Sequence, residues 1–350
     1  MFKRENTRQF NIGSVKIGGG APVTIQSMTN TKTADINATV NQINRLTEAG
    51  CEIVRVTVPD MQSAEALKEI KRRIKIPLVA DIHFDYRLAL ESIKNGVDKI
   101  RLNPGNIGDA ERVKAVVKAA KERNIPIRIG VNSGSVEREL LEKYDGPTPG
   151  AVVESAERHI KILEDNSFEN IVVSLKMSDV SGTIEAYKIF AEKWDIPLHV
   201  GVTEAGTVKA GSIKSAVGIG SILSQGIGNT IRVSLTGDPV EEVLVAKQIL
   251  KSLKLIPMGV NIVSCPTCGR TNVDLPSLAE KIEKALSACK KNITVAVMGC
   301  AVNGPGEARE ADYGVACGKG DGLLFKKGEI IKKVKEAEIA DELLAMIDNS

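Results

Sequence analysis

One pattern repeats eight times between residues 23 and 250: a short β-branched run is followed by a longer stretch with helical periodicity. The runs occupy residues 23–29, 53–59, 77–84, 99–105, 125–134, 171–179, 197–206 and 229–239. Helical segments such as 38–50, 109–124 and 149–166 lie between them. Eight strand–helix units predict an α/β fold of the TIM-type (β/α)₈ barrel class. The alternative is a doubly wound parallel sheet, which often carries a GxGxxG turn after its first strand. The glycines at 18–20 precede the first run and lack that context, so we expect an ordinary turn there.

The chain has 350 residues, more than a single hydrophobic core usually organises. Segment 239–256 has the pattern of a last barrel helix, and Pro257 to Gly259 resemble a boundary. We therefore expect a substrate-binding barrel over residues 1–257 and a small α/β domain over residues 258–350. In the second domain we expect strands at 261–265, 293–299 and 312–317, a hairpin at 322–331, and helices at 275–292 and 334–348.

The charge balance excludes several classes of function. Lys and Arg number 47 and Asp and Glu number 44, a net charge of +3 that does not suggest a general nucleic-acid or membrane surface. No apolar run approaches the roughly 18 residues needed to span a bilayer, and the first residues lack the apolar region of a secretory signal. We expect a cytoplasmic protein that binds neither nucleic acid nor membrane.

Polar residues stand two apart in the C-terminal halves of six runs, where a barrel core normally has Val, Ile or Leu. Residues two apart share one face of a strand. The pairs are Arg55/Thr57, Asp81/His83, Arg101/Asn103, Ser174/Lys176 and Arg232/Ser234, together with Arg128/Asn132, which are four apart on one face with Gly130 between them. Any one of these cations could be a simple ion-pair partner. Five of them at one barrel mouth are costly unless an anion meets them, and the arginine fork suits phosphate, so we predict a diphosphate ligand.

Two further residues are candidates for proton chemistry. His83 shares the strand face of Asp81. It is either a residue of the proton chemistry or a structural histidine paired with the Asp81 carboxylate. Glu204 lies near the end of the seventh run, past the expected strand, where it is either a counter-ion to the cationic mouth or a proton donor. As a donor it would need its pKa raised by burial.

The six cysteines are concentrated near the C-terminus, at 265, 268, 289, 300 and 317, with Cys51 apart. Cys265 and Cys268 form a CxxC, and Cys300 follows in a second loop. Three thiolates can anchor a cubane iron–sulfur cluster, although zinc and purely structural thiols remain open. A zinc ribbon would need a second CxxC, and none is present. We expect Cys51 and Cys289 to be buried as small hydrophobes.

The motifs SCPTCGR (264–270) and GCAVNGPGEA (299–308) occur together with VRVTVPD, DIHFDYRLAL, KIRLNPGN, RIGVNSGS, VSLKMSD, HVGVTEAG and IRVSLTGDP. In this combination the chain closely resembles the bacterial 4-hydroxy-3-methylbut-2-en-1-yl diphosphate synthase family, in its compact two-domain form. The resemblance covers nearly the whole chain, with no departure at any motif position.

The resemblance implies a reaction and a cofactor. The family reductively opens and dehydrates 2-C-methyl-D-erythritol 2,4-cyclodiphosphate to 4-hydroxy-3-methylbut-2-enyl diphosphate, a step of non-mevalonate isoprenoid synthesis. Its two electrons pass from flavodoxin or ferredoxin through a 4Fe–4S cluster. The cluster ligands map onto Cys265, Cys268, Cys300 and Glu307.

The resemblance also implies roles for the barrel residues. Glu204 matches the catalytic acid, with His83 as the second catalytic candidate. Asn303 would reach the substrate from a capping cluster domain, which in the family belongs to the partner chain of a homodimer. The remaining substrate-binding positions map onto Arg55, His83, Arg101, Asn103, Arg128, Asn132, Lys176, Arg232 and Ser234.

Two functions of other classes stay open on the residues alone. A non-redox barrel enzyme, such as a phosphate-ester lyase with a structural zinc domain, would contain zinc without iron or sulfide. A nucleic-acid-binding module with a zinc finger would need a basic C-terminal region. Residues 258–350 carry 12 Lys and Arg against 13 Asp and Glu, which argues against the second.

Overall fold

The computed structural model of this chain describes residues 2–286, 289, 291–300 and 309–349. It divides into two compact units, Met1–Ile256 and Pro257–Ser350. The division falls one residue before the boundary expected from the sequence. Each unit has its own hydrophobic core.

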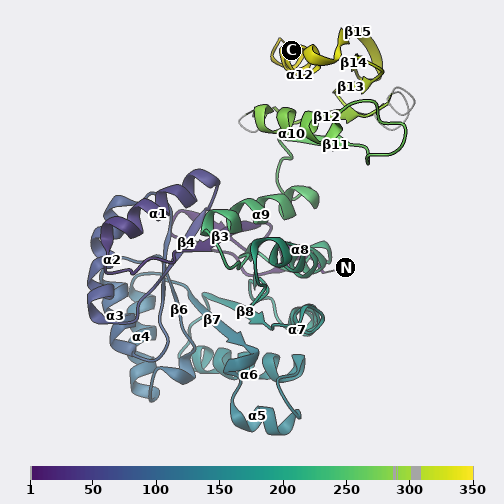
Figure 1. Cartoon of the computed structure of the whole chain (residues 1–350). Helices are drawn as coiled ribbons and strands as arrows, with labels where there is room; N and C mark the ends of the chain where they lie inside the picture. Colours follow the sequence, from purple (N-terminus) through teal and green to yellow (C-terminus); the bar gives the residue numbers. More distant parts are fainter. Residues whose placement is uncertain (1, 287–288, 290, 301–308, 350) are drawn as a thin grey trace. The chain divides into compact units, whose positions relative to one another are not determined.

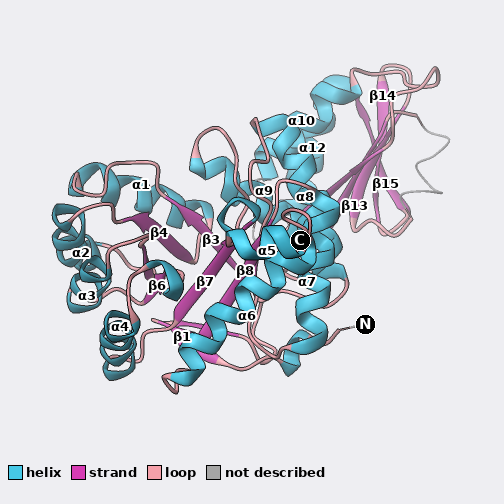
Figure 2. Ribbon diagram, turned by 90° about the horizontal axis from the view of Figure 1, so that it is seen from below, coloured by secondary structure: helices cyan, strands magenta, loops and turns pink. Residues whose placement is uncertain are grey.

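The first unit is a parallel eight-stranded barrel surrounded by helices (Figures 1 and 2). Its strands lie in the order β8-β7-β6-β5-β4-β3-β10-β9. The ring closes between β8 and the start of β9, where Val173 bridges Leu198 and the Val173 N–H donates to the Pro197 carbonyl at 3.0 Å. The predicted (β/α)₈ barrel is therefore confirmed, and a doubly wound sheet is excluded. The strands are β3 (Thr24–Met28), β4 (Ile53–Thr57), β5 (Leu78–Asp81), β6 (Lys99–Arg101), β7 (Ile127–Asn132), β8 (Ile171–Lys176), β9 (His199–Val200) and β10 (Thr230–Ile231).

The strands are shorter than the β-branched runs in the sequence, because the ends of the runs turn into loops. In β6, for example, the strand stops at Arg101 and Pro104–Asn106 forms a 3₁₀ turn. Proline has no N–H to continue the ladder. Residues just past the strand ends, such as Asn103 and His83, therefore lie on loops at the barrel mouth.

An acidic or hydroxyl residue starts most of the barrel helices. The side chains of Asp35, Asp60, Asp85, Asp109, Thr148, Asp179 and Asp238 each accept a hydrogen bond from a backbone N–H of the first helical turn. Such caps satisfy donors that the helix itself leaves open and so define where each strand–helix loop ends. The helices are α1 (Ile36–Ala49), α2 (Met61–Arg73), α3 (Tyr86–Lys94), α4 (Ala110–Glu122), α5 (Arg138–Lys143), α6 (Pro149–Asp165), α7 (Val180–Lys193), α8 (Val208–Ser224) and α9 (Pro239–Ser252).

A short antiparallel hairpin, β1 (Phe10–Ile12) with β2 (Val15–Ile17), precedes the barrel and was not expected from the sequence. Ile12 and Ile17 are fully buried and form one cluster with the first inward residues of three strands. Those strand residues are Ile53, Val79 and Val172. The hairpin thus closes the N-terminal end of the barrel with an apolar layer. The glycines at 18–20 follow it with positive φ angles, as expected of a turn.

The second unit is a five-stranded sheet in sequential order, with three parallel strands followed by an antiparallel hairpin. Its strands are β11 (Val260–Ser264), β12 (Ile293–Met298), β13 (Tyr313–Cys317), β14 (Asp321–Lys326) and β15 (Glu329–Lys335). Helices α10 (Leu275–Leu286) and α12 (Ile339–Asp348) share a core with the sheet. The predicted small α/β domain is confirmed. The helix expected from residue 334 begins only at Ile339, because β15 continues pairing with β14 as far as Lys335.

None of the described helices is both long enough and apolar enough to cross a lipid bilayer.

Candidate active site

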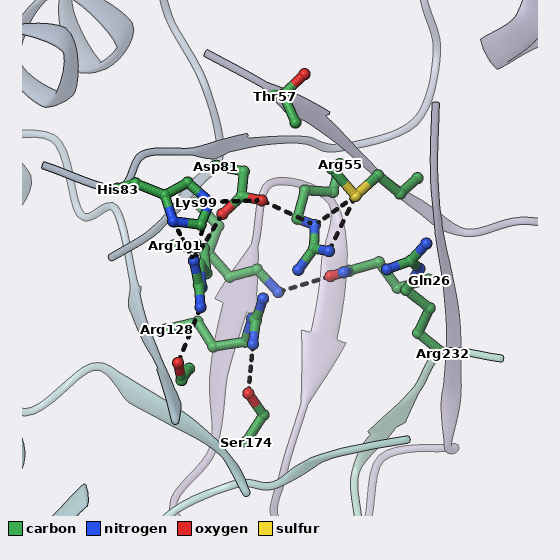
Figure 3. A network of polar contacts seen from close by, with 12 residues as sticks. Gln26, Arg55, Thr57, Asp81, His83, Lys99, Arg101, Arg128, Ser174 and Arg232 are labelled. Atoms are coloured by element: carbon green, nitrogen blue, oxygen red, sulfur yellow. Dashed lines mark hydrogen bonds and ion pairs between the residues drawn. The ribbon is translucent and has the colours of Figure 1, made fainter. Parts of the chain in front are cut away.

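The polar residues predicted on the barrel strands lie side by side on its inner face. In the strand register Thr57 is next to Asp81, Asp81 is next to Arg101, and Arg101 is next to Arg128. Figure 3 shows the side chains from these strands turned toward one another inside the barrel. Because successive side chains of a strand point to opposite faces, the polar residues of each strand all face the same barrel interior.

Positive charge dominates this interior. Six cations, Arg55, Lys99, Arg101, Arg128, Lys176 and Arg232, share it with two buried carboxylates, Asp81 and Glu242, an excess of four positive charges. Asp81 lies 3.3 Å from Nη1 of Arg101 and 3.7 Å from Nε of Arg55. Burial alone would raise the pKa of Asp81, but Arg55 and its other neighbours hold that pKa well below its ordinary value. The Asp81 carboxylate is therefore charged near neutral pH.

The second carboxylate, Glu242, comes from helix α9. It accepts hydrogen bonds from the Ser27 hydroxyl at 3.1 Å and the Leu235 N–H at 3.0 Å. Nη2 of Arg232 lies 3.5 Å away. No strand pattern could have indicated Glu242, because it approaches the interior from a helix.

Several buried donors of the cationic cluster have no hydrogen-bond partner within the described part of the chain. They are Nε and Nη2 of Arg128 and the Nε atoms of Arg101 and Arg232. Burial lowers the pKa values of Arg128 and Lys176, and neighbouring arginines lower both further. Buried charged donors without acceptors are costly. The arrangement is suited to an anion with several oxygens.

Two glycines make room for the cations. A Cβ at Gly130 would lie 2.6 Å from Nε of Arg101 and 3.1 Å from Nη1 of Arg128. A Cβ at Gly201 would lie 2.7 Å from Nζ of Lys176. The close approach of these side chains to the backbone therefore requires glycine.

The predicted asparagines and serine have different surroundings. Asn103 is buried and uses its whole amide on the backbone of Gly130, accepting from its N–H at 2.9 Å and donating to its carbonyl at 3.2 Å. Asn132 caps the short turn Ser133–Ser135, and Ser234 is half-buried past the end of β10. Asn103 thus ties the loop after β6 to β7, in addition to any contact with a ligand.

The two candidates for proton chemistry are both at the exposed rim. His83 has 56% of its side chain exposed, and its Nε2 lies 3.7 Å from Asp81. Glu204 is exposed and has a φ of +52°. The burial that a proton donor was expected to need is absent around Glu204 within the barrel unit. The left-handed backbone at a non-glycine residue is a strained conformation of the kind found at functional sites.

The cysteines lie at one end of the second sheet. Cys265 follows β11 directly, and Cys300 lies two residues past the end of β12. These two strands are parallel neighbours. The Gly299 N–H donates to Sγ of Cys265 at 3.3 Å. Cys268 is exposed, and the backbone and side chain of Arg270 lower the pKa of its thiol. The CxxC loop and the loop after β12 are thus brought together by strand pairing.

The other cysteines lie in a hydrophobic core or at the edge of one. Cys51 is buried, as expected, and Cys289 is half-buried. Cys317 ends β13 and is buried, and burial raises the pKa of its thiol to about 12. Glu307 and Asn303 lie outside the described residues. Among the side chains that are described, no three His, Cys, Asp or Glu residues are close enough to hold a metal ion.

The structure adds polar interior residues that the sequence argument overlooked: Gln26, Lys99, His199 and Thr230 are all buried. Lys99 stands two residues before Arg101, so the spacing rule that identified Arg101 could have found it. His199 and Thr230 are joined at 2.7 Å between Nδ1 and Oγ1.

In comparisons with known proteins, both units match domain models of one family. Residues 7–247 match the family model of the GcpE TIM-barrel domain, and residues 261–349 match that of the GcpE protein C-terminal domain. A 4-hydroxy-3-methylbut-2-en-1-yl diphosphate synthase (flavodoxin) from Clostridium perfringens is 61% identical over 347 residues, covering 99% of each chain. The protein of the same name from Geobacillus thermodenitrificans is 61% identical, covering 99% of this chain and 93% of its own.

Among solved structures, dihydropteroate synthase from Yersinia pestis has a TM-score of 0.51 and 13% identity, covering 71% of this chain and 99% of that one. The same enzyme from Stenotrophomonas maltophilia also has a TM-score of 0.51, with 12% identity, covering 72% and 100%. At this identity the likeness shows the barrel fold alone.

Proposed function

Because the chain belongs to the GcpE family of 4-hydroxy-3-methylbut-2-en-1-yl diphosphate synthases, we infer that it catalyses their reaction. The substrate is 2-C-methyl-D-erythritol 2,4-cyclodiphosphate, and the product is (E)-4-hydroxy-3-methylbut-2-enyl diphosphate. A ring C–O bond to the diphosphate breaks and a hydroxyl leaves as water. Two electrons and one proton balance the step. The observation that carries the inference is the cluster of six cations, four of them buried and two half-buried, in which several N–H donors have no partner among the described residues.

The barrel residues bind and orient the diphosphate. Arg101, Arg128 and Arg232 offer buried N–H groups to its oxygens. The barrel residues that complete the proposed set are Arg55, His83, Asn103, Asn132, Lys176 and Ser234. A diphosphate carries negative charge that the excess of cations can neutralise. Fixing it there holds the carbon ring in one orientation, which lowers the entropy cost of reaching the transition state. Guanidinium groups suit this role because they bind phosphate oxygens in pairs.

The second unit would hold a 4Fe–4S cluster through Cys265, Cys268, Cys300 and Glu307, the last of which lies outside the described residues. Strand pairing brings the loops of the first and third cysteines together, and a backbone N–H already points at Sγ of Cys265. Hydrogen bonds of this kind tune iron–sulfur sites. When bound, the cluster supplies single electrons, chemistry that no side chain can perform.

Glu204 is the proposed acid that protonates the departing hydroxyl. It lies at the mouth of the barrel, in the loop after β9 that also carries Gly201. Because its carboxyl is exposed in the isolated barrel unit, we infer that a capping domain covers it during the reaction. That domain would come from the partner chain of a homodimer and would bring Asn303 to the substrate. Flavodoxin, named in the relatives, or ferredoxin would deliver the electrons.

The test is an assay of anaerobically purified protein for iron, acid-labile sulfide and reduction of the cyclodiphosphate with a chemical reductant. We expect about four irons and four sulfides per chain, from the cubane stoichiometry, and formation of the hydroxybutenyl diphosphate. Zinc without sulfide, and no reduction of the substrate, would instead support a non-redox lyase with a structural zinc domain.

A further inference from the structure

Lys99 is buried more completely than a lysine normally is. Its side chain lies on the inner face of β6, two residues before Arg101, and none of it is exposed. Its Nζ donates to Oε1 of Gln26 on β3, at 3.0 Å. Lysine is almost never fully buried unless it is paired with an opposite charge.

No carboxylate pairs with Lys99 in the part of the chain that the structure describes. Its charged neighbours are Arg128 and Arg55, which are themselves cations. Burial lowers the pKa of Lys99 far below its ordinary value, and these two arginines lower it further. In the barrel without ligand, the charged form of Lys99 is therefore disfavoured by its neighbours, and Val, Ile or Leu would be the usual occupant of such a position.

The position of Lys99 in the layers of the barrel explains what it can do. In the strand register it lies beside Val79, which belongs to the apolar layer closed by the N-terminal hairpin. Arg101 lies two residues further along β6 on the same face, nearer the mouth, whereas Arg55 pairs with the same Val79 and is level with Lys99. Lys99 thus occupies the floor of the cationic cluster, and Figure 3 shows its side chain extending between Arg55 and Arg128 toward Gln26.

We propose that Lys99 is an additional residue of the diphosphate site, which strengthens anion binding from the floor of the barrel, and that Gln26 is the positioning residue that holds its ammonium there. The inference rests on the proposed function and extends it by one layer of the barrel. Attraction between charges weakens slowly with distance in a dry interior, so a cation deeper in the barrel than Arg101 acts on the diphosphate without touching it. Gln26 serves because its neutral carbonyl orients the ammonium without cancelling its charge.

The experiment compares Lys99→Met with wild type in two measurements: the affinity for inorganic pyrophosphate and for the cyclodiphosphate, and the thermal unfolding midpoint without ligand. We expect both affinities to fall roughly ten-fold or more. We expect the midpoint to stay level or rise, because a neutral side chain of similar length removes a buried repulsion. A merely structural lysine predicts the opposite: a lower midpoint with unchanged affinities. That result would overturn the proposal.

A second variant, Gln26→Glu, keeps the test valid if Lys99→Met fails to fold. A carboxylate at this position would neutralise Lys99, so the free protein should become more stable while pyrophosphate binds more weakly. Unchanged pyrophosphate affinity would contradict the proposal. Lys114→Met, at an exposed position of α4, removes the same charge from the surface and should leave both affinities unchanged.

The outcomes separate this inference from the proposed function. If the wild-type protein converts the cyclodiphosphate but both variants keep their affinities, the proposed reaction stands and only the role of Lys99 is refuted. If pyrophosphate binds more weakly to both variants but the wild-type protein does not convert the cyclodiphosphate, the role of Lys99 is supported and the proposed reaction is refuted. If wild type binds neither ligand, the anion site and the inference are both wrong.

Discussion

At the scale of single residues, the barrel interior depends on where side chains are absent. Gly130 is next to the guanidinium groups of Arg101 and Arg128, and its backbone holds the amide of Asn103 on both sides. One methyl group here would displace atoms that are proposed to bind the diphosphate. Precise placement of charged donors, more than their number, decides how well they bind an anion.

Gly130→Ala should therefore raise KM strongly and lower kcat, with a smaller effect on stability. The added Cβ would meet Nε of Arg101 at 2.6 Å, and a flexible guanidinium can move away at the expense of its position. Gly134→Ala is the matched control, because nothing lies within 4 Å of a Cβ there. Steady-state kinetics of both variants check the prediction. Equal KM values for the two would contradict it.

Glu204→Gln should abolish turnover while substrate affinity and iron content persist, because an amide keeps the shape of the acid but cannot deliver its proton. The stability should not change, since both residues experience the same left-handed backbone, with φ at +52°. Glu204→Gly, by contrast, should stabilise the protein by about 1 kcal/mol through relief of that conformation. Activity assays and thermal unfolding separate these effects. A Gln variant with most of its activity would transfer the role of proton donor to His83.

At the scale of elements, the loops of the barrel mouth are tied together from behind. His159 of α6 is buried and accepts the Gly105 N–H on Nδ1 at 3.3 Å. Its Nε2 lies 3.5 Å from the Glu137 carboxylate at the start of α5. One imidazole thus links the loop after β6, which carries Asn103, to the segment after β7. The accepting Nδ1 requires the neutral form of the ring.

The stability of the barrel should consequently fall in mild acid. Burial lowers the pKa of His159 below its ordinary value of 6.5, although Glu137 acts in the opposite direction. A histidine with a lowered pKa in the folded state contributes stability that is complete above about pH 6.5 and is lost as pH falls through the lowered pKa. His199, buried and lowered likewise, adds to the loss.

His159→Gln removes the titration and should reduce the difference in unfolding midpoint between about pH 7.5 and about pH 5.5. Thermal unfolding of wild type and variant at the two pH values measures the effect. If the variant loses as much stability in acid as wild type does, His159 is not a source of the pH dependence.

At the scale of the whole molecule, the proposed site needs two chains: the barrel of one and the cluster domain of its partner. This arrangement predicts complementation between two inactive variants. Glu204→Gln disables the barrel, and Cys300→Ala disables the cluster domain. In a mixed dimer, one of the two sites combines an intact barrel with an intact cluster domain.

Coexpression of Glu204→Gln and Cys300→Ala should therefore restore activity, on the order of a quarter of wild type for random pairing of chains. Each variant expressed alone provides the control and should be inactive. If each barrel instead worked with its own cluster domain, both sites of a mixed dimer would be dead. Mixed dimers without activity would thus contradict the exchange of domains between chains.

The sequence by itself determined the barrel and most of its cationic residues. Both signals are local: strand–helix alternation repeats every few tens of residues, and side chains two apart on a strand share a face whatever surrounds it. The pattern around Arg55, Arg101 and Arg128 could thus be interpreted without knowing the neighbours of each strand. The same local logic predicted the second domain and the positions of its cysteine loops.

Only the tertiary structure decided which groups complete the interior. Glu242 reaches Arg232 from a helix, Gln26 meets Lys99 from a strand that is not its neighbour, and the hairpin at residues 10–17 closes the barrel from below. These contacts join residues that are ten to more than a hundred positions apart and follow no periodicity. They depend on barrel closure and helix packing, which bring side chains together according to distance in space, and a sequence pattern carries no measure of that distance.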